Sequence, residues 1–253
     1  MSELEVQPVA DAATGLTQLE RITCTFTAPS RTFEDIKRGN RSWWLPLIVM
    51  ALAGYLLFAV VSQKIGLQQV VDNQVRFSPK AQERIANATP EQRQTSSKIS
   101  IAITKGVFIG GPVLGLIFIA VFSLVLLGTI NFIFGGRAKY SNIFAVYYYA
   151  YLPTVVKVLL GIVVIYAGIA PESFNIKNFA PTNVGAFLDP AETNPAIYAL
   201  ATSIDAITIW ILVLLGIGVS TVAGVKRSSG YIAVFGWWAI GVLLGVTAAA
   251  VFA

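Results

Sequence analysis

Two charged residues lie inside or beside long apolar stretches of this sequence, and they are its clearest candidates for chemistry. Lys157 follows the tyrosine-rich segment FAVYYYAYLP, and Asp205 precedes the apolar run AITIWILVLLGIG. A charge in the middle of a bilayer is costly, so one that is kept there usually has a partner or a function. We therefore expect Lys157 and Asp205 to form an ion pair between two membrane helices.

The predicted depths of the two residues favour this pairing. Counted from the outer ends of their helices, Lys157 lies roughly 21 Å deep and Asp205 roughly 15 Å deep at 1.5 Å per residue. The long lysine side chain covers that difference. The alternative is that Asp205 stays hydrated near the outer surface while Lys157 extends towards the interface. The sequence leaves both arrangements open.

Other polar groups in apolar segments are candidates for lining a site beside this pair. They are the amides of Asn131 and Asn142 and the hydroxyl groups of Tyr147, Tyr148 and Tyr149. The chain has no histidine and a single cysteine, Cys24, which excludes histidine-based metal sites and serine–histidine nucleophile pairs. Phosphate loops, GxSxG and HExxH are also absent from the sequence. We expect no catalytic residue, metal or cofactor, and a protein that is not an enzyme.

The composition identifies the environment of these residues. Apolar residues make up 55% of the 253 residues and charged residues only 12%, about half the usual share in soluble domains. The net charge of +5 comes from basic residues in tails and loops that flank the apolar runs, so nucleic acid is not an expected partner. The expected partner is the lipid bilayer.

Five segments are long and apolar enough to cross the ~30 Å hydrocarbon core as helices. They cover about residues 43–64, 107–134, 141–169, 196–224 and 230–252. The predicted fold is an all-α membrane protein, a bundle of five transmembrane helices with a helical extramembrane loop between the first two. Trp43 and Trp44 begin the first span, where aromatic side chains anchor a helix at the interface.

The chain divides into three predicted parts. Residues 1–25 are expected to be a disordered tail, and residues 26–42 an interfacial amphipathic segment with Phe33 and Ile36 on one face of a short helix. Residues 43–253 form the membrane domain.

Smaller signals refine this division. Ser78 before Pro79 and Thr89 before Pro90 each predict a capped helix start in the first loop. The Gly110-Gly111-Pro112 sequence predicts a loose or kinked start to the second span. Two pairs of glycines, Gly111 with Gly115 and Gly241 with Gly245, have the spacing that allows close helix packing, which is their expected role.

The distribution of basic residues predicts the orientation. The short turns at 135–139 and 226–228 carry two basic residues each, and the segment from Arg31 to Arg41 carries four. The positive-inside rule places these in the cytoplasm, so five spans put the N-terminus inside and the C-terminus outside. The long first loop, which is also rich in Lys and Arg, works against this orientation.

Three blocks in order resemble the Yip family, integral membrane proteins named for interaction with Ypt/Rab GTPases, and in particular its prokaryotic members. The blocks are TAPSRTFEDIKRGNRSWWLPLIV, FGGRAKYSNIFAVYYYAYLPTVV and IDAITIWILVLLGIGVSTVAGVKRSSGYIAVFGWWAIGVLLG. The resemblance covers roughly residues 24–250. It implies five spans, a cytosolic N-terminus, a prokaryotic cytoplasmic membrane and no catalytic residue. The DLYGP-type motif of eukaryotic members is missing, so a Rab partner is not expected.

Two functions follow as hypotheses. The first is a non-enzymatic scaffold or membrane-organising, trafficking-like module that binds an unknown membrane-protein partner. The second is a small carrier or lipid-translocating protein with a polar path around Lys157 and Asp205. The identity of the partner and assembly into a homo-oligomer are left open.

Overall fold

The computed structural model describes residues 15–252, which form a bundle of long helices. Five of the described helices are long and apolar enough to cross a membrane. The expected all-α fold with five spans is therefore confirmed. The spans are α3 (Trp44–Lys64), α6 (Pro90–Gly128, extended by a π-turn over Thr129–Ile133), α7 with α8 (Tyr140–Ala150 and Pro153–Tyr166), α10 (Ala206–Ala223) and α11 (Arg227–Phe252).

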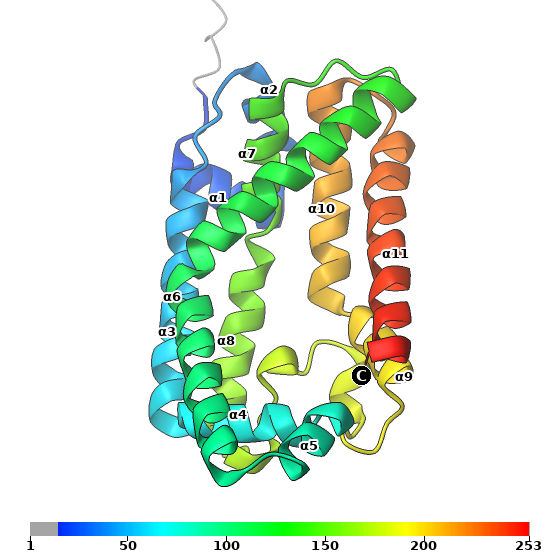
Figure 1. Cartoon of the computed structure of the whole chain (residues 1–253). Coiled ribbons are helices and arrows are strands. Elements are labelled where there is room, and N and C mark those ends of the chain that lie inside the picture. The colour runs from blue at the N-terminus through cyan, green and yellow to red at the C-terminus, as the bar shows by residue number, and fades with distance from the viewer. Residues whose placement is uncertain (1–14, 253) are drawn as a thin grey trace, which may run out of the picture.

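Two short helices, α4 (Leu67–Arg76) and α5 (Pro79–Ala86), form the helical loop between the first two spans (Figure 1). Both predicted caps are present. The Ser78 hydroxyl accepts a hydrogen bond from the backbone of Ala81, and Thr89 forms a reciprocal capping box with Gln92 at the start of α6. This first loop is thus mostly helical because its local capping signals are strong.

The N-terminal segment is more ordered than the sequence predicted. Residues 1–14 lie outside the described residues, but α1 (Gln18–Thr27) occupies the end of the expected disordered tail. Thr17 and Glu20 form a capping box at its start, and the bonds from the Thr17 backbone N–H and hydroxyl lower the pKa of the Glu20 carboxyl. The prediction of disorder up to residue 25 was wrong because it overlooked this cap.

The following helix, α2 (Pro29–Arg38), lies within the predicted segment 26–42 and is followed by Gly39, whose φ of 124° favours glycine. Its Phe33 and Ile36 are fully buried against α7 and α10. The apolar face therefore packs on the protein, whereas the sequence predicted that it would lie on the bilayer surface.

Span boundaries differ from the predictions at two places. The predicted fourth span is broken: α9 (Pro195–Ser203) ends before Ile204, and α10 begins at Ala206 with Asp205 as its N-cap. The second span, in contrast, passes through Pro112 without interruption and changes direction along its length (Figure 1).

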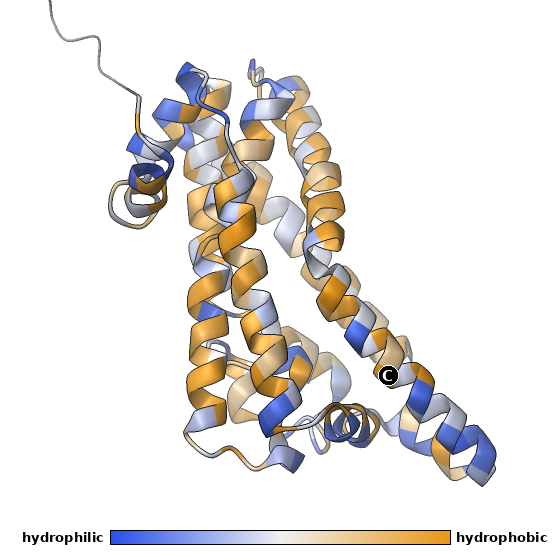
Figure 2. Ribbon diagram, turned by 90° about the vertical axis from the view of Figure 1, so that its left-hand side faces the viewer, coloured by the Kyte–Doolittle hydropathy of each residue, from blue (hydrophilic) through white to orange (hydrophobic). Residues whose placement is uncertain are grey.

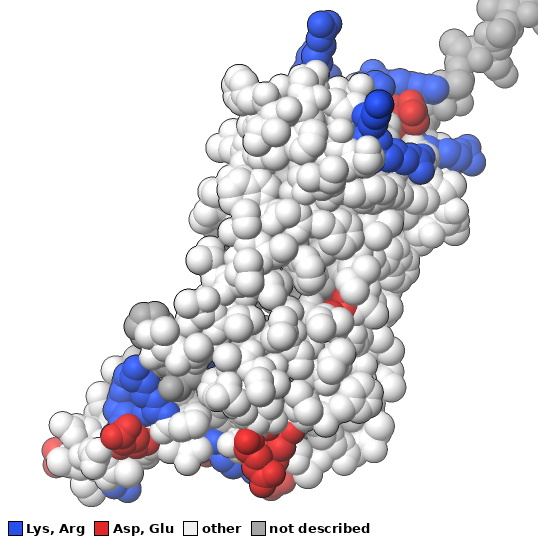
Figure 3. Space-filling view, turned by 90° about the vertical axis from the view of Figure 1, so that its right-hand side faces the viewer, with Lys and Arg blue, Asp and Glu red and all other residues white. Residues whose placement is uncertain are grey.

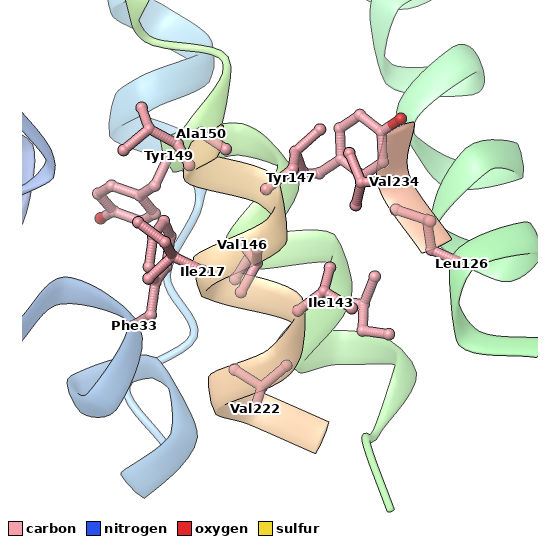
Figure 4. Close-up of a cluster of buried hydrophobic side chains, with 14 of the residues drawn as sticks. Phe33, Leu126, Ile143, Val146, Tyr147, Tyr149, Ala150, Ile217, Val222 and Val234 are labelled. Atoms are coloured by element: carbon pink, nitrogen blue, oxygen red, sulfur yellow. The ribbon is translucent and has the colours of Figure 1, made fainter. Parts of the chain in front are cut away.

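The centre of the core is α7, which is buried along most of its length and packs against α2, α6 and α10. Glycine makes the closest approaches. A Cβ on Gly218 would lie 2.4 Å from Val146 Cγ1, and one on Gly230 would lie 2.4 Å from the Gly216 carbonyl oxygen. Figure 4 shows the buried side chains of α2, α7 and α10 filling the space between these helices.

Polar residues gather at the two ends of the bundle, and the helices between them are apolar (Figure 2). One end, here called the basic end, holds α1, α2 and the two short turns, which are joined by the hydrogen bond from Arg137 N to the Ala223 carbonyl. Lys and Arg predominate there, whereas charges of both signs occupy the other end (Figure 3). This loop end holds α4, α5, α9 and residues 171–194, with 3₁₀ turns over Pro171–Ser173, Ile176–Asn178 and Val184–Phe187.

Candidate functional site

The structure brings Lys157 and Asp205 together. Lys157 Nζ lies 2.8 Å from Asp205 Oδ2, within hydrogen-bonding distance. Lys157 is on α8 and Asp205 caps α10, so the contact joins the third and fourth spans. The carboxylate side chain is 2% exposed and the lysine side chain 24% exposed. The pair is therefore asymmetric, with its negative partner enclosed and its positive partner partly open.

Asp205 is buried because it lies at the break between α9 and α10, where both the start of α10 and the loop contact its side chain. Its Oδ1 accepts from the backbone N–H of Thr208, which caps α10, and its Oδ2 accepts from the Thr182 hydroxyl at 2.7 Å. The backbone N–H groups of Ala206 and Val184 donate to the carbonyl groups of Thr182 and Ile204. The loop thus satisfies the backbone that the broken helix leaves free.

A series of side-chain hydrogen bonds continues from Asp205 into the loop end. Asn183 Nδ2 donates to Asn178 Oδ1 at 2.6 Å and approaches Asp205 Oδ2 at 3.5 Å. Asn178 and Asn175 both donate to the hydroxyl oxygen of Tyr198 on α9. These residues hold the irregular loop on α9 and on the start of α10.

Sequence reasoning missed the loop side of this network. Thr182 and Asn183 were read only as part of an irregular loop, because they lie 23 and 22 residues before Asp205. The density of asparagine in NIKNFAPTN was the available signal, since asparagine side chains often satisfy irregular backbone. It does not reveal which acidic residue the loop meets.

The exposed side of Lys157 faces a cavity of about 610 Å³, here called the Lys157 cavity. Its walls come from α6, α7, α8, α10 and α11, and α9 contributes at the loop end. The side chains are mostly apolar, and Thr154, Thr202 and Thr208 are among the polar ones. A second, more apolar cavity of about 630 Å³ lies between α3 and α6.

The three predicted lining tyrosines point to three different places. Tyr147 lines the Lys157 cavity, and Tyr148 lines the cavity between α3 and α6. Tyr149 points to the other side of α7 from Tyr147 (Figure 4), where its hydroxyl donates to the Ser42 carbonyl at 3.0 Å. Consecutive residues of a helix diverge by about 100° at 3.6 residues per turn, so they do not share one wall.

The two predicted asparagines lie away from Lys157. Asn131 exchanges hydrogen bonds of 3.0 and 2.9 Å with the backbone of Ala138 and so holds the glycine turn at the basic end. Asn142 is buried in the first turn of α7. At 1.5 Å per residue, the 15 residues to Lys157 correspond to about 22 Å of helix.

The two tryptophans at the start of the first span differ. Trp44 is 50% exposed, which leaves its prediction as an interface anchor in place. Trp43 packs inward, with ring centroids 5.1 Å from those of both Tyr148 and Phe144. Trp43 packs against the core because the start of α3 contacts α7.

The arrangement can bind charged and hydrogen-bonding groups beside an apolar surface. Within residues 15–252, no three His, Cys, Asp or Glu side chains are grouped to hold a metal ion. Lys157 contacts one carboxylate that is already occupied, and several hydroxyl groups line the same cavity.

Asp205→Asn is expected to lower the thermal-unfolding midpoint, and Asp205→Ala to lower it further. Asn removes the charge facing Lys157 but keeps an acceptor for Thr208, whereas Ala also removes the cap, a loss of ~0.5–2 kcal/mol. Removing one partner of a fully buried pair costs ~3–5 kcal/mol, and the partial exposure of Lys157 places this case below that range. Fluorescence-detected gel filtration after heating measures the midpoints.

The double variant Lys157→Leu/Asp205→Asn tests whether the two side chains stabilise each other. We expect it to be more stable than the sum of the single changes predicts, because neither charge is then left alone. Asn194→Ala, which removes the exposed cap of α9, controls for capping without an ion pair. Strict additivity of the two single changes would contradict the pairing.

Comparison with known families completes the description of the site. No curated protein and no solved structure matches the chain. The family model of the Yip1 domain matches residues 23–249, which include all five spans almost to their ends and both members of the Lys157–Asp205 pair. This confirms the resemblance read from the three sequence blocks, and the chain belongs to the Yip1 domain family of multi-pass membrane proteins.

Proposed function

We propose that this protein is a non-enzymatic membrane-organising scaffold that binds another membrane protein through the uncovered faces of α6 and α11. The observation that carries this proposal is the uneven burial of the spans. In the most apolar stretch of each helix, 67% of α10 is buried, against 22% for α6 and 11% for α11. In these stretches most residues of α6 and α11 are therefore partly or fully exposed, as are those of α3, of which 28% are buried.

The outward face of α11 supplies the partner surface in this proposal. Ile232, Ile240, Leu243 and Leu244 are all 46% or more exposed. An added Cβ on Gly236, which lies between them, would meet no atom within 4 Å. A small residue among large apolar ones lets a second helix approach closely in a bilayer.

Purification from native membranes after crosslinking is expected to recover a partner in a fixed ratio. The variant Ile240→Ala/Leu244→Ala shortens two exposed side chains of α11 and should lose that partner. Leu52→Ala/Leu56→Ala, on the equally exposed face of α3, is the matched control and should keep it. A chain recovered without any stoichiometric partner would refute the scaffold.

The broken fourth span favours a second candidate, a small carrier or lipid-translocating protein. Discontinuous helices with charged groups at the break are common in transporters. Here the break at Ile204 and Asp205 lies beside Lys157 and its cavity.

Reconstituted vesicles test the carrier candidate directly. It predicts lipid scrambling or ion flux above that of empty vesicles, and a large reduction in Lys157→Leu because the polar group on the path is lost. Lys105→Leu removes an exposed lysine of α6 outside both cavities and should leave the flux unchanged. Flux at the level of empty vesicles removes this candidate.

The proposed location is a prokaryotic cytoplasmic membrane with the basic end in the cytoplasm. The excess of Lys and Arg at this end supports the orientation. Cys24, which is partly exposed on α1, reports on it because it is the only cysteine of the sequence.

A membrane-impermeant maleimide is expected to leave Cys24 unlabelled in intact cells and to label it in inverted vesicles. The reciprocal control is Glu83→Cys in a Cys24→Ser background, which places the thiol on α5 and should react from outside. Labelling of Cys24 in intact cells would reverse the orientation.

A further inference from the structure

The Lys157 cavity has the features of a lipid-binding site, and we infer that it holds a single-chain amphiphile with an acidic head group, whose carboxylate or phosphate contacts the Lys157 ammonium. This inference needs no protein partner and no transport. It concerns a cavity in which a charged group that belongs to a spanning helix meets mostly apolar walls.

The ammonium group has capacity for a ligand. A lysine has three N–H donors, and within residues 15–252 the one polar contact of Lys157 is Asp205. Asp205 in turn accepts from the Thr182 hydroxyl at the same oxygen, Oδ2, and from the Thr208 backbone N–H at Oδ1. The carboxylate therefore has several donors, whereas the partly exposed Lys157 ammonium, which lines the cavity, has donors left for a ligand.

The walls around the lysine match an acyl chain. Away from Lys157 they consist of large apolar side chains of three helices, among them Phe122 of α6, Leu212 and Leu215 of α10, and Val242 and Val246 of α11. The cavity of about 610 Å³ is in the ~300–1,000 Å³ range of sites for one small ligand. That size fits one chain with its head group better than a two-chain phospholipid.

Two glycines of α11 form part of this shape. We expected Gly241 and Gly245 to pack against a neighbouring helix, but no atom lies within 4 Å of a Cβ built on either. Both line the Lys157 cavity. Near the basic end, Trp237 Nε1 donates to Thr129 Oγ1 at 2.9 Å and joins α11 to the end of α6.

The lipid bilayer is the source of the ligand. The two helices that form the outer walls, α6 and α11, are the least buried spans, so their other faces lie against acyl chains. A water-soluble anion would leave the apolar walls unfilled, whereas an amphiphile covers them and supplies the charge that Lys157 attracts. Charge-assisted hydrogen bonds to an ammonium are stronger in such surroundings than in water.

The test uses the purified full chain in phosphatidylcholine nanodiscs with a diazirine-bearing palmitate as the probe. We expect crosslinks to α6, α10 or α11 residues that line the cavity, competed by palmitate and not by the neutral alcohol of equal length or by acetate. Lys157→Met should reduce labelling roughly tenfold or more, as loss of a charged hydrogen bond predicts. Lys157→Arg, which keeps the charge, should retain most of it.

Two glycine variants test the binding site without altering Lys157. Gly245→Leu places a side chain in the cavity and should abolish labelling, whereas Gly236→Leu, on the outward face of the same helix, should leave it unchanged. Elution as a single species in gel filtration verifies that each variant is folded.

The inference is overturned if the neutral alcohol competes as well as palmitate, if the crosslinks lie outside the cavity, or if Gly245→Leu labels like the unaltered chain. None of these outcomes bears on the scaffold, because the purified chain contains no partner. Conversely, a failure to recover a protein partner leaves this binding measurement unaffected.

Discussion

Polar groups inside a bilayer must be satisfied by the protein itself, and the break before α10 is where this constraint is most demanding. Helix α9 ends at Ser203 and α10 starts at Ala206, so backbone donors and acceptors between them lack partners within a helix, near the loop end of the bundle. Asp205 meets the demand by capping α10 and accepting from Thr182 and Lys157. The loop, the fourth span and the third span all depend on this one carboxylate.

The membrane environment also influences where the helices pack closely. In this bundle the closest packing is between α10 and its neighbours α7 and α11. Apolar side chains gain little from leaving lipid for protein, so helices associate where small residues let them approach. Gly218 allows α10 to contact Val146 of α7, and Gly230 allows α11 to reach the backbone of Gly216. The remaining helix, α6, packs on α3, α4 and α7. The cavity between α3 and α6 is lined by Gly111 and Gly115, which have no close neighbour.

The site combines these two features. The satisfied carboxylate holds Lys157 at the edge of the uncovered region, and the loose contact between α6 and α11 leaves space in front of it. The match to the Yip1 domain family, over residues 23–249, covers this whole arrangement. Recognition of other membrane components is the activity that such a surface supports, whether the component is a protein on the outer faces or a lipid in the cavity.

Local capping signals were predicted well where their chemistry is contained in a few residues, as at Ser78 and Thr89. The same kind of signal at Thr17 was overlooked in a segment judged by its composition, and α1 was missed. At Ile204 and Asp205, a continuous apolar pattern concealed a break. Hydropathy measures transfer into lipid and does not report whether the backbone stays helical.

By itself the sequence determined the five spans, their order, the basic end and the two charged residues, because hydropathy and charge are properties of short segments. It also proposed that Lys157 and Asp205 meet, since both had to lie at a similar depth. Only the tertiary structure decided which partners enclose Asp205, which tyrosine faces Lys157, and where space remains. Those outcomes depend on how helices distant in sequence rotate and pack against one another, and here glycine contacts and a loop of hydrogen bonds set that packing.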